Sequence, residues 1–145
     1  MTTWLSPHFS LEELIITEHR EFDNLPPPEV RAILLATAQQ MELVRHALGD
    51  RPISVSSGYR CPALNAAVGS SPGSAHITGH AVDFCCLTLG DPLEVAKVLE
   101  HAEVAFDQLI HEFGRWVHVS FDPRMRGERL TIDRQGVRAG LLPIR

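Results

Sequence analysis

The chain has 145 residues, of which 44% are apolar and 21% are charged, and its formal net charge at pH 7 is −5. This length predicts a single domain spanning residues 1–145, and the negative charge argues against nucleic acid as the main partner. No apolar run approaches the ~20 residues that cross a bilayer, so we expect no membrane insertion.

The N-terminus and the cysteines both indicate a protein made in a reducing compartment. Residues 1–4 lack the charged segment and the apolar segment of a secretory signal, which predicts synthesis in the cytoplasm without a signal peptide. Cys61, Cys85 and Cys86 are odd in number and lack the paired spacing of a zinc ribbon. We therefore expect buried free thiols rather than disulfides or a thiolate metal site.

The segment that follows Ser120 is basic, with six arginines against three acidic residues. Such a segment could contact an anionic polymer such as a cell wall. A solvated charged surface explains the same residues more simply.

Three stretches carry clear helix signals. Ser10 to Glu13 forms a capping box, in which serine and glutamate satisfy the first free amides of a helix reciprocally. Pro28 suits the first position of a longer helix that Gly49 would end. Asp91 to Glu94 is another strong helix start, with an N-cap aspartate followed by proline. The sequence predicts helices over residues 11–16, 28–48, 62–68 and 92–103.

The strands are predicted by alternation of apolar and polar residues and by the turns between them. Residues 108–113 and 116–121 form a plausible hairpin around Gly114-Arg115. The pattern of elements predicts an α+β fold in one domain: a central, mainly antiparallel sheet with packed helices. The sequence predicts strands over residues 52–56, 81–86, 108–113, 116–121, 129–132 and 137–142.

Two short stretches carry the candidate chemistry. Ser74 to Asp83 contains His76 and Asp83 seven residues apart, and Trp116 to Ser120 places His118 inside an apolar strand. Two imidazoles and a carboxylate leave room for a water molecule, which is the arrangement that catalytic zinc requires. A single one of these residues could equally be a hydrogen-bonded structural residue, so the prediction depends on the complete set.

Strand alternation allows the two strand residues to share a metal ion. Asp83 points away from its apolar neighbours Val82 and Phe84, and His118 points away from Val117 and Val119. The apolar face of each strand suits the core. The opposite face is therefore free to carry a polar site.

The spacing Ser-x-His-x-x-Gly-x-Ala-x-Asp from Ser74 to Asp83, followed by Trp-x-His at 116–118, resembles a known family. It is similar to the zinc D-alanyl-D-alanine peptidases and the phage-type L-alanyl-D-glutamate endopeptidases, whose fold is shared with the hedgehog signalling domain. Ser57-Gly58-Tyr59-Arg60 also matches. Further residues resemble the small single-domain branch found in phages, namely Phe9 to Leu14, Asn24 and Leu64-Asn65.

This resemblance implies a hedgehog/DD-peptidase-like fold and assigns roles to several residues. His76, Asp83 and His118 would be the ligands of one zinc ion per chain. Arg60 would hold a substrate carboxylate or the polarised carbonyl oxygen. Substrate contacts are expected from Arg60, Ser74 and Trp116.

The catalytic base is where the resemblance weakens. Several branches carry an acid three residues before the last histidine ligand, and here that position is Arg115. The candidates are Glu112 and His111. A two-residue hairpin loop would set His111 beside His118, whereas a three-residue loop through Trp116 would set Glu112 opposite His118. The small phage-like branch favours Glu112, although an exposed hairpin carboxylate with no role would explain that residue too.

The resemblance implies a zinc metallopeptidase that hydrolyses stem peptides of bacterial peptidoglycan, as a DD-carboxypeptidase or an endolysin-type endopeptidase. We expect a monomer that acts on the cell wall as a phage or prophage lysis or virion protein. The alternative is a catalytically inactive zinc-containing module that binds the wall or belongs to the phage structure. The residues leave open which peptide bond is cut.

Overall fold

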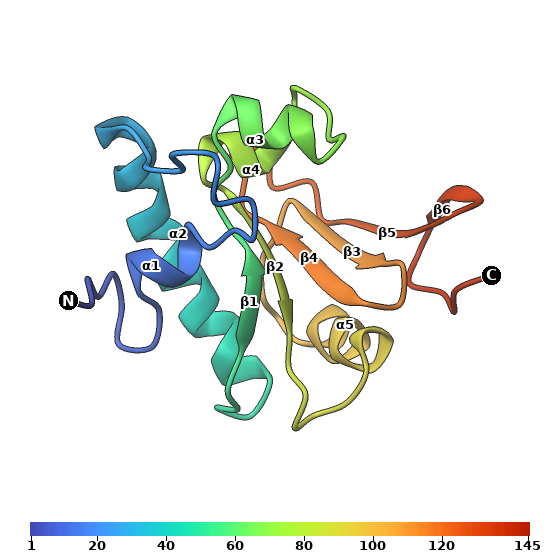
Figure 1. The fold of residues 1–145 in the computed structure, drawn as a ribbon. Helices are drawn as coiled ribbons and strands as arrows, with labels where there is room; N and C mark the ends of the chain where they lie inside the picture. Colours follow the sequence, from blue (N-terminus) through green and yellow to red (C-terminus); the bar gives the residue numbers. More distant parts are fainter.

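The structure is a computed structural model that describes all residues from Met1 to Arg145. Five helices and six strands make up the chain (Figure 1). The helices are α1 (Leu11–Leu14), α2 (Pro28–Ala47), α3 (Pro62–Ala67), α4 (Ala75–Thr78) and α5 (Pro92–His101). The strands are β1 (Ser54–Ser57), β2 (Ala81–Cys85), β3 (Gln108–Glu112), β4 (Trp116–Ser120), β5 (Glu128–Asp133) and β6 (Gly136–Ala139).

All six strands form one sheet in the order β1-β2-β4-β3-β5-β6. Every neighbouring pair is antiparallel except β3 and β5, which run parallel. The predicted α+β class with a mainly antiparallel sheet is therefore confirmed. The parallel pair is a departure from the pattern of simple hairpins, because the chain passes from β4 across the end of the sheet to the far side of β3.

One face of the sheet carries the hydrophobic core. Leu34, Ala38, Met41 and Val44 recur at helical spacing on the buried side of α2, in a single cluster with residues of α1 and α5. The sheet contributes alternate residues to the same cluster, namely Val82 and Phe84 from β2, Leu109 from β3, and Val117 and Val119 from β4. Side chains between them on these strands point to the opposite face, which is where Asp83, Glu112 and His118 lie.

The helix ends follow their capping residues. Ser10 makes the predicted reciprocal capping box with Glu13, and Asp91 caps α5 by accepting a hydrogen bond from the amide of Glu94. The sequence did not predict α4, a single turn that Ser74 caps and that Gly79 ends with a φ of +86°. Figure 1 places α3 and α4 together at one end of β2. None of the helices combines the length and the apolar character needed to cross a membrane.

Candidate metal centre

Three buried side chains from different elements converge on the polar face of the sheet. Pairing of β2 with β4 sets Asp83 directly opposite His118, and α4 supplies His76. Oδ1 of Asp83 lies 2.9 Å from Nδ1 of His118 and 3.3 Å from Nε2 of His76. One donor atom from each residue lies within 4.8 Å of the other two, and the residues are only 3–6% exposed.

The ring of His76 is oriented by the segment that follows β1. Its Nδ1–H donates a 2.7 Å hydrogen bond to the carbonyl oxygen of Gly58, and its own carbonyl oxygen accepts from the amide of Arg60. Because Nδ1 carries the proton, Nε2 is the free nitrogen that faces Asp83. A carbonyl that orients a histidine in this way is the usual companion of a metal ligand.

Charges within this cluster shift its pKa values. Burial lowers the pKa of His76 more than the nearby Asp83 carboxylate raises it, which favours the neutral imidazole. Burial opposes ionisation of Asp83, but the two imidazoles together hold its pKa below its ordinary value. Burial also disfavours the charged form of His118, yet the hydrogen bond and charge of Asp83 raise its pKa overall.

This donor set fits a zinc ion. Two imidazole nitrogens and one carboxylate oxygen are ligands that zinc accepts, and three protein ligands leave a coordination position for water or substrate. A cation bound here would have to displace the proton shared by His118 and Asp83, because metal ligands must be deprotonated. The predicted residues His76, Asp83 and His118 are thus brought together in a geometry that suits the metal.

Arg60 lies at the edge of the same cluster. Its guanidinium donates hydrogen bonds to Oγ of Ser57 at 3.1 Å, Oδ1 of Asn65 at 3.2 Å and Oδ2 of Asp83 at 3.4 Å. These contacts use three of its five N–H donors. The remaining donors are available to an anionic group, and the side chain is mostly buried.

The β3–β4 hairpin differs from both registers considered in the sequence. Its loop consists of Phe113, Gly114 and Arg115, so that Glu112 pairs with Trp116 and Ile110 pairs with His118. Both predicted pairings, His111 beside His118 and Glu112 opposite His118, are wrong. The reason is that Phe113 leaves the strand with a φ of +56° and becomes part of the loop.

In the observed register Glu112 and His118 still share the polar face as diagonal neighbours. Oε1 of Glu112 lies 3.7 Å from Nδ1 of His118. Burial is the main reason that the pKa of Glu112 lies above its ordinary value. His111 points to the opposite face, where it is buried and its Nδ1–H donates to the carbonyl oxygen of Leu142 at 2.9 Å.

A cleft of about 750 Å³ opens beside these groups. Arg60, Asp83, Glu112 and Trp116 line it together with Leu64 of α3 and Val68, which follows that helix, and residues 16–19 form another part of its wall. Ser74 is not among its lining residues. The Ser74 hydroxyl instead accepts a hydrogen bond from the amide of His76, so its direct effect is to hold the start of α4.

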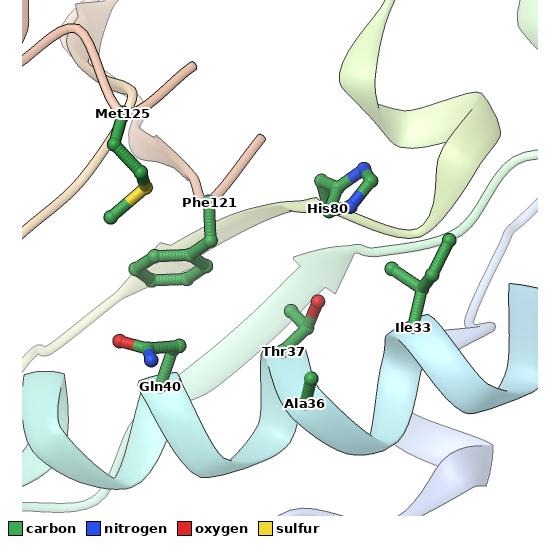
Figure 2. A pocket seen from close by; sticks show the side chains of 7 residues that line it. All are labelled: Ile33, Ala36, Thr37, Gln40, His80, Phe121 and Met125. Atoms are coloured by element: carbon green, nitrogen blue, oxygen red, sulfur yellow. The ribbon is translucent and has the colours of Figure 1, made fainter. Parts of the chain in front are cut away.

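A second cavity of about 300 Å³ lies between α2 and the loop that follows β4 (Figure 2). Its lining residues are Ile33, Ala36, Thr37, Gln40, His80, Phe121 and Met125, none of which lines the cleft. His80 is its sole histidine, and Nδ1 of His80 lies 2.7 Å from the hydroxyl of Thr78. This cavity lacks the converging donors of the metal centre.

The basic C-terminal segment is largely neutralised within the fold. Asp133 pairs with both Arg138 and Arg145, Arg126 pairs with Asp107, and Arg129 pairs with Glu100. Arg124 likewise pairs with Asp122. These contacts agree with the simpler interpretation of a charged surface. Cys61, Cys85 and Cys86 are free, but only Cys86 is buried as predicted, whereas Cys61 and Cys85 are partly exposed.

Several residues that hold the site had no chemical signal in the sequence. Asn24 donates to the carbonyl oxygens of Ile15 and Tyr59 and accepts from the amide of Cys61, which fixes the segment carrying Gly58 and Arg60. Asn65 is buried and donates to the carbonyl oxygen of Ser71 while it supports Arg60. Only the family resemblance points to these two asparagines, because the role of a buried asparagine depends on tertiary partners that the sequence does not show.

Comparison with known proteins agrees with this geometry. The model of a family described as Peptidase M15 matches residues 7–120, a range that includes every element from α1 to β4. A zinc D-Ala-D-Ala carboxypeptidase from Streptomyces albus G is 41% identical over 64 residues, which cover 39% of this chain. The aligned part corresponds to 25% of that relative, so the chain matches about a quarter of its length.

Proposed function

We propose that this chain, which belongs to the Peptidase M15 family, is a zinc-dependent peptidase that hydrolyses peptide bonds in the stem peptides of bacterial peptidoglycan. One observation carries the proposal: the buried donors of His76, Asp83 and His118 converge beside a cleft that also contains Arg60 and Glu112. The named activity of the curated relative supports the choice of metal and of substrate class.

His76, Asp83 and His118 would hold one zinc ion per chain. Bound zinc supplies Lewis acidity, which polarises the scissile carbonyl and lowers the pKa of a water molecule toward ~7. The protein residues keep the ligand atoms in place before the metal arrives. Gly58 orients His76, and the pairing of β2 with β4 aligns Asp83 with His118.

Glu112 is the proposed general base. Its carboxylate shares a face with His118 and lines the cleft, where it can accept a proton from the attacking water and return it to the leaving amine. His111 was the alternative, but its ring is on the other face of β3 and its Nδ1–H is engaged with Leu142. Because successive side chains of β3 point to opposite faces, the face that carries His118 favours Glu112 as the base.

Arg60 is the proposed anion-binding residue. Ser57, Asn65 and Asp83 hold its guanidinium in place, and two N–H donors remain for a substrate carboxylate or for the oxyanion of the tetrahedral intermediate. Trp116 would contact the substrate from the cleft wall. Ser74 does not line the cleft, so a substrate contact from it would have to use the hydroxyl hydrogen that capping of α4 leaves free.

We further propose that residues 1–145 act as one monomeric zinc peptidase domain at the cell wall. Participation of strands from β1 to β6 in one sheet supports the single unit. Assignment to a phage or prophage lysis or virion protein rests on the resemblance of Phe9 to Leu14, Asn24 and Leu64-Asn65 to the small phage branch.

Mass analysis of products released from purified peptidoglycan tests the proposal, with zinc-loaded protein and with chelator present. Release of D-alanine identifies a DD-carboxypeptidase, whereas a new N-terminal D-glutamate identifies an L-alanyl-D-glutamate endopeptidase. Products must disappear with chelator and return with zinc. Binding to the wall without any product would instead support the inactive wall-binding module.

A further inference from the structure

Phe113 has a backbone conformation that is unfavourable for its side chain. Its φ is +56°, and it is one of only three non-glycine residues with a positive φ, the others being Asp50 and Met125. A bulky residue in the left-handed region clashes with its own backbone, so this position of the loop favours glycine. Such a residue persists where the surroundings or a function require its side chain.

The left-handed backbone changes the direction of the Phe113 ring. In a continued strand, Phe113 would point to the face opposite Glu112, because successive side chains alternate. In the structure both residues line the same cleft. The ring lies 5.8 Å from the ring of Trp116 at an interplanar angle of 57°, and the residue is 41% exposed.

The ring therefore extends an apolar surface next to the reacting groups. Phe113 and Trp116 form this surface on the hairpin, and α3 and the residue after it add Leu64 and Val68 to the same cleft. Glu112 directly precedes Phe113, so the ring begins one residue, or roughly 3.5 Å of backbone, from the proposed base. A substrate side chain beside the scissile bond would therefore find apolar surface next to the charged side chains of Arg60 and Glu112.

We propose that Phe113 is a specificity-determining residue, whose ring contacts a small alkyl side chain of the peptide next to the scissile bond. An alanyl residue, whose methyl group can lie against an aromatic ring, has the required chemistry. The strained loop conformation is retained because it delivers this ring to the cleft. This inference rests on the proposed peptidase function.

The test compares Phe113→Gly, Phe113→Ala and Phe113→Tyr, with a synthetic stem peptide that contains both L-alanyl-D-glutamyl and D-alanyl-D-alanine bonds. Glycine removes the ring and the strain, alanine removes only the ring, and tyrosine keeps both. We expect the glycine variant to melt several degrees above the alanine variant. Both should raise KM about tenfold, because the apolar contact is lost, while the tyrosine variant keeps KM near that of the unchanged protein.

Met125→Gly is the matched control, since Met125 also has a positive φ but lines the second cavity. It should raise the melting temperature without changing KM. Calorimetric binding of the same peptide to zinc-loaded Glu112→Gln protein, with and without Phe113→Gly, supplies a readout that does not need turnover.

These measurements separate the two levels of inference. Normal turnover with an unchanged KM in Phe113→Gly overturns the role of Phe113 and leaves the peptidase function standing. Peptide binding that Phe113→Gly weakens, without turnover by the unchanged protein, overturns the function but supports the contact. A protein that neither binds nor cleaves the peptide contradicts both.

Discussion

The Nδ1–H of His76 and the carbonyl oxygen of Gly58 form a 2.7 Å hydrogen bond between α4 and the segment that follows β1. This bond determines which nitrogen of His76 faces Asp83. Gly58 is able to approach because it has no side chain: an added Cβ would lie 2.3 Å from the carbonyl oxygen of Leu14. The orientation of His76, a proposed metal ligand, thus depends on close contact between two backbone segments.

Gly58→Ala should therefore damage both stability and metal binding. Its methyl group would clash with backbone rather than with a flexible side chain, so we expect a loss of about 1–3 kcal/mol in the free energy of unfolding. Displacement of the carbonyl should weaken zinc affinity by roughly 10–100-fold. Denaturant unfolding and competition with a zinc chelator measure the two effects. Gly73→Ala is the control, because its new methyl would make only an ordinary contact; equal losses in both variants would refute the explanation.

Removal of either histidine ligand should abolish stoichiometric zinc. His76→Ala and His118→Ala each leave two of the three donors, which is too few for a stable zinc site in a protein. Elemental analysis after zinc loading should give one zinc per unchanged chain and none in these variants. His80→Ala should keep its zinc, because His80 lies at the second cavity. Full metal content in His118→Ala would rule out the proposed ligand set.

Chelation should lower the melting temperature without unfolding the protein. The hydrophobic core lies on the face of the sheet opposite the metal centre and does not include the ligands. Bound zinc adds about 2.7 kcal/mol when its concentration is a hundred times the Kd, and this contribution is lost to the chelator. Differential scanning calorimetry should still show a cooperative transition for the metal-free protein. Absence of that transition would mean that zinc is needed for folding itself.

Glu112→Gln should separate catalysis from metal binding. The amide keeps the size of the side chain but cannot accept the proton, so turnover should fall by ~10²–10⁴ with zinc content unchanged. His111→Asn should keep kcat and lose only about 1 kcal/mol of stability through its hydrogen bond to Leu142. Release of soluble peptide from peptidoglycan measures both. A fully active Glu112→Gln protein with an inactive His111→Asn protein would make His111 the base.

Asp107 should contribute to stability in a pH-dependent way. Hydrogen bonds from Arg126, at 2.9 and 3.0 Å, hold the pKa of this buried carboxyl below its ordinary value. The contribution is therefore present above the unfolded pKa of ~3.9 and is lost as the pH falls through the lower folded value. Asp107→Asn should lower the free energy of unfolding by about 1.5–3 kcal/mol at neutral pH. It should also reduce the fall in that free energy as the pH is lowered. Unfolding measured from pH 7 to 2 tests this. If the variant loses stability at low pH as steeply as the unchanged protein, the pair of Asp107 and Arg126 is not a source of the pH dependence.

Sequence patterns predicted the elements with strong local signals. The capping box at Ser10, Pro28 at the start of α2 and the Asp91 cap of α5 all depend on neighbouring residues, and all three occur. The turn α4 was missed because a single helical turn is too short for periodicity. Alternation along β2 and β4 placed Asp83 and His118 on one face, which the strand pairing confirms.

The hairpin register was not predictable from local pattern. Gly114-Arg115 has the composition of a two-residue turn. Phenylalanine rarely adopts a left-handed backbone conformation, so its presence does not predict that Phe113 joins the loop. The parallel pairing of β3 with β5 joins segments about twenty residues apart and depends on the whole sheet. The hydrogen bonds from Asn24 to the carbonyl oxygens of Ile15 and Tyr59 are also tertiary contacts, which a local sequence pattern does not predict.

The parallel position of β5 has a consequence for how the protein is made. As the chain leaves the ribosome, β3 and β4 can pair while the far edge of β3 is still bare. The Nδ1–H of His111 can form its hydrogen bond only after Leu142, thirty-one residues later in the chain, has been synthesised. The strand that carries Glu112 therefore has a neighbour on both sides only once β5 has been synthesised, later in the chain than His76, Asp83 and His118.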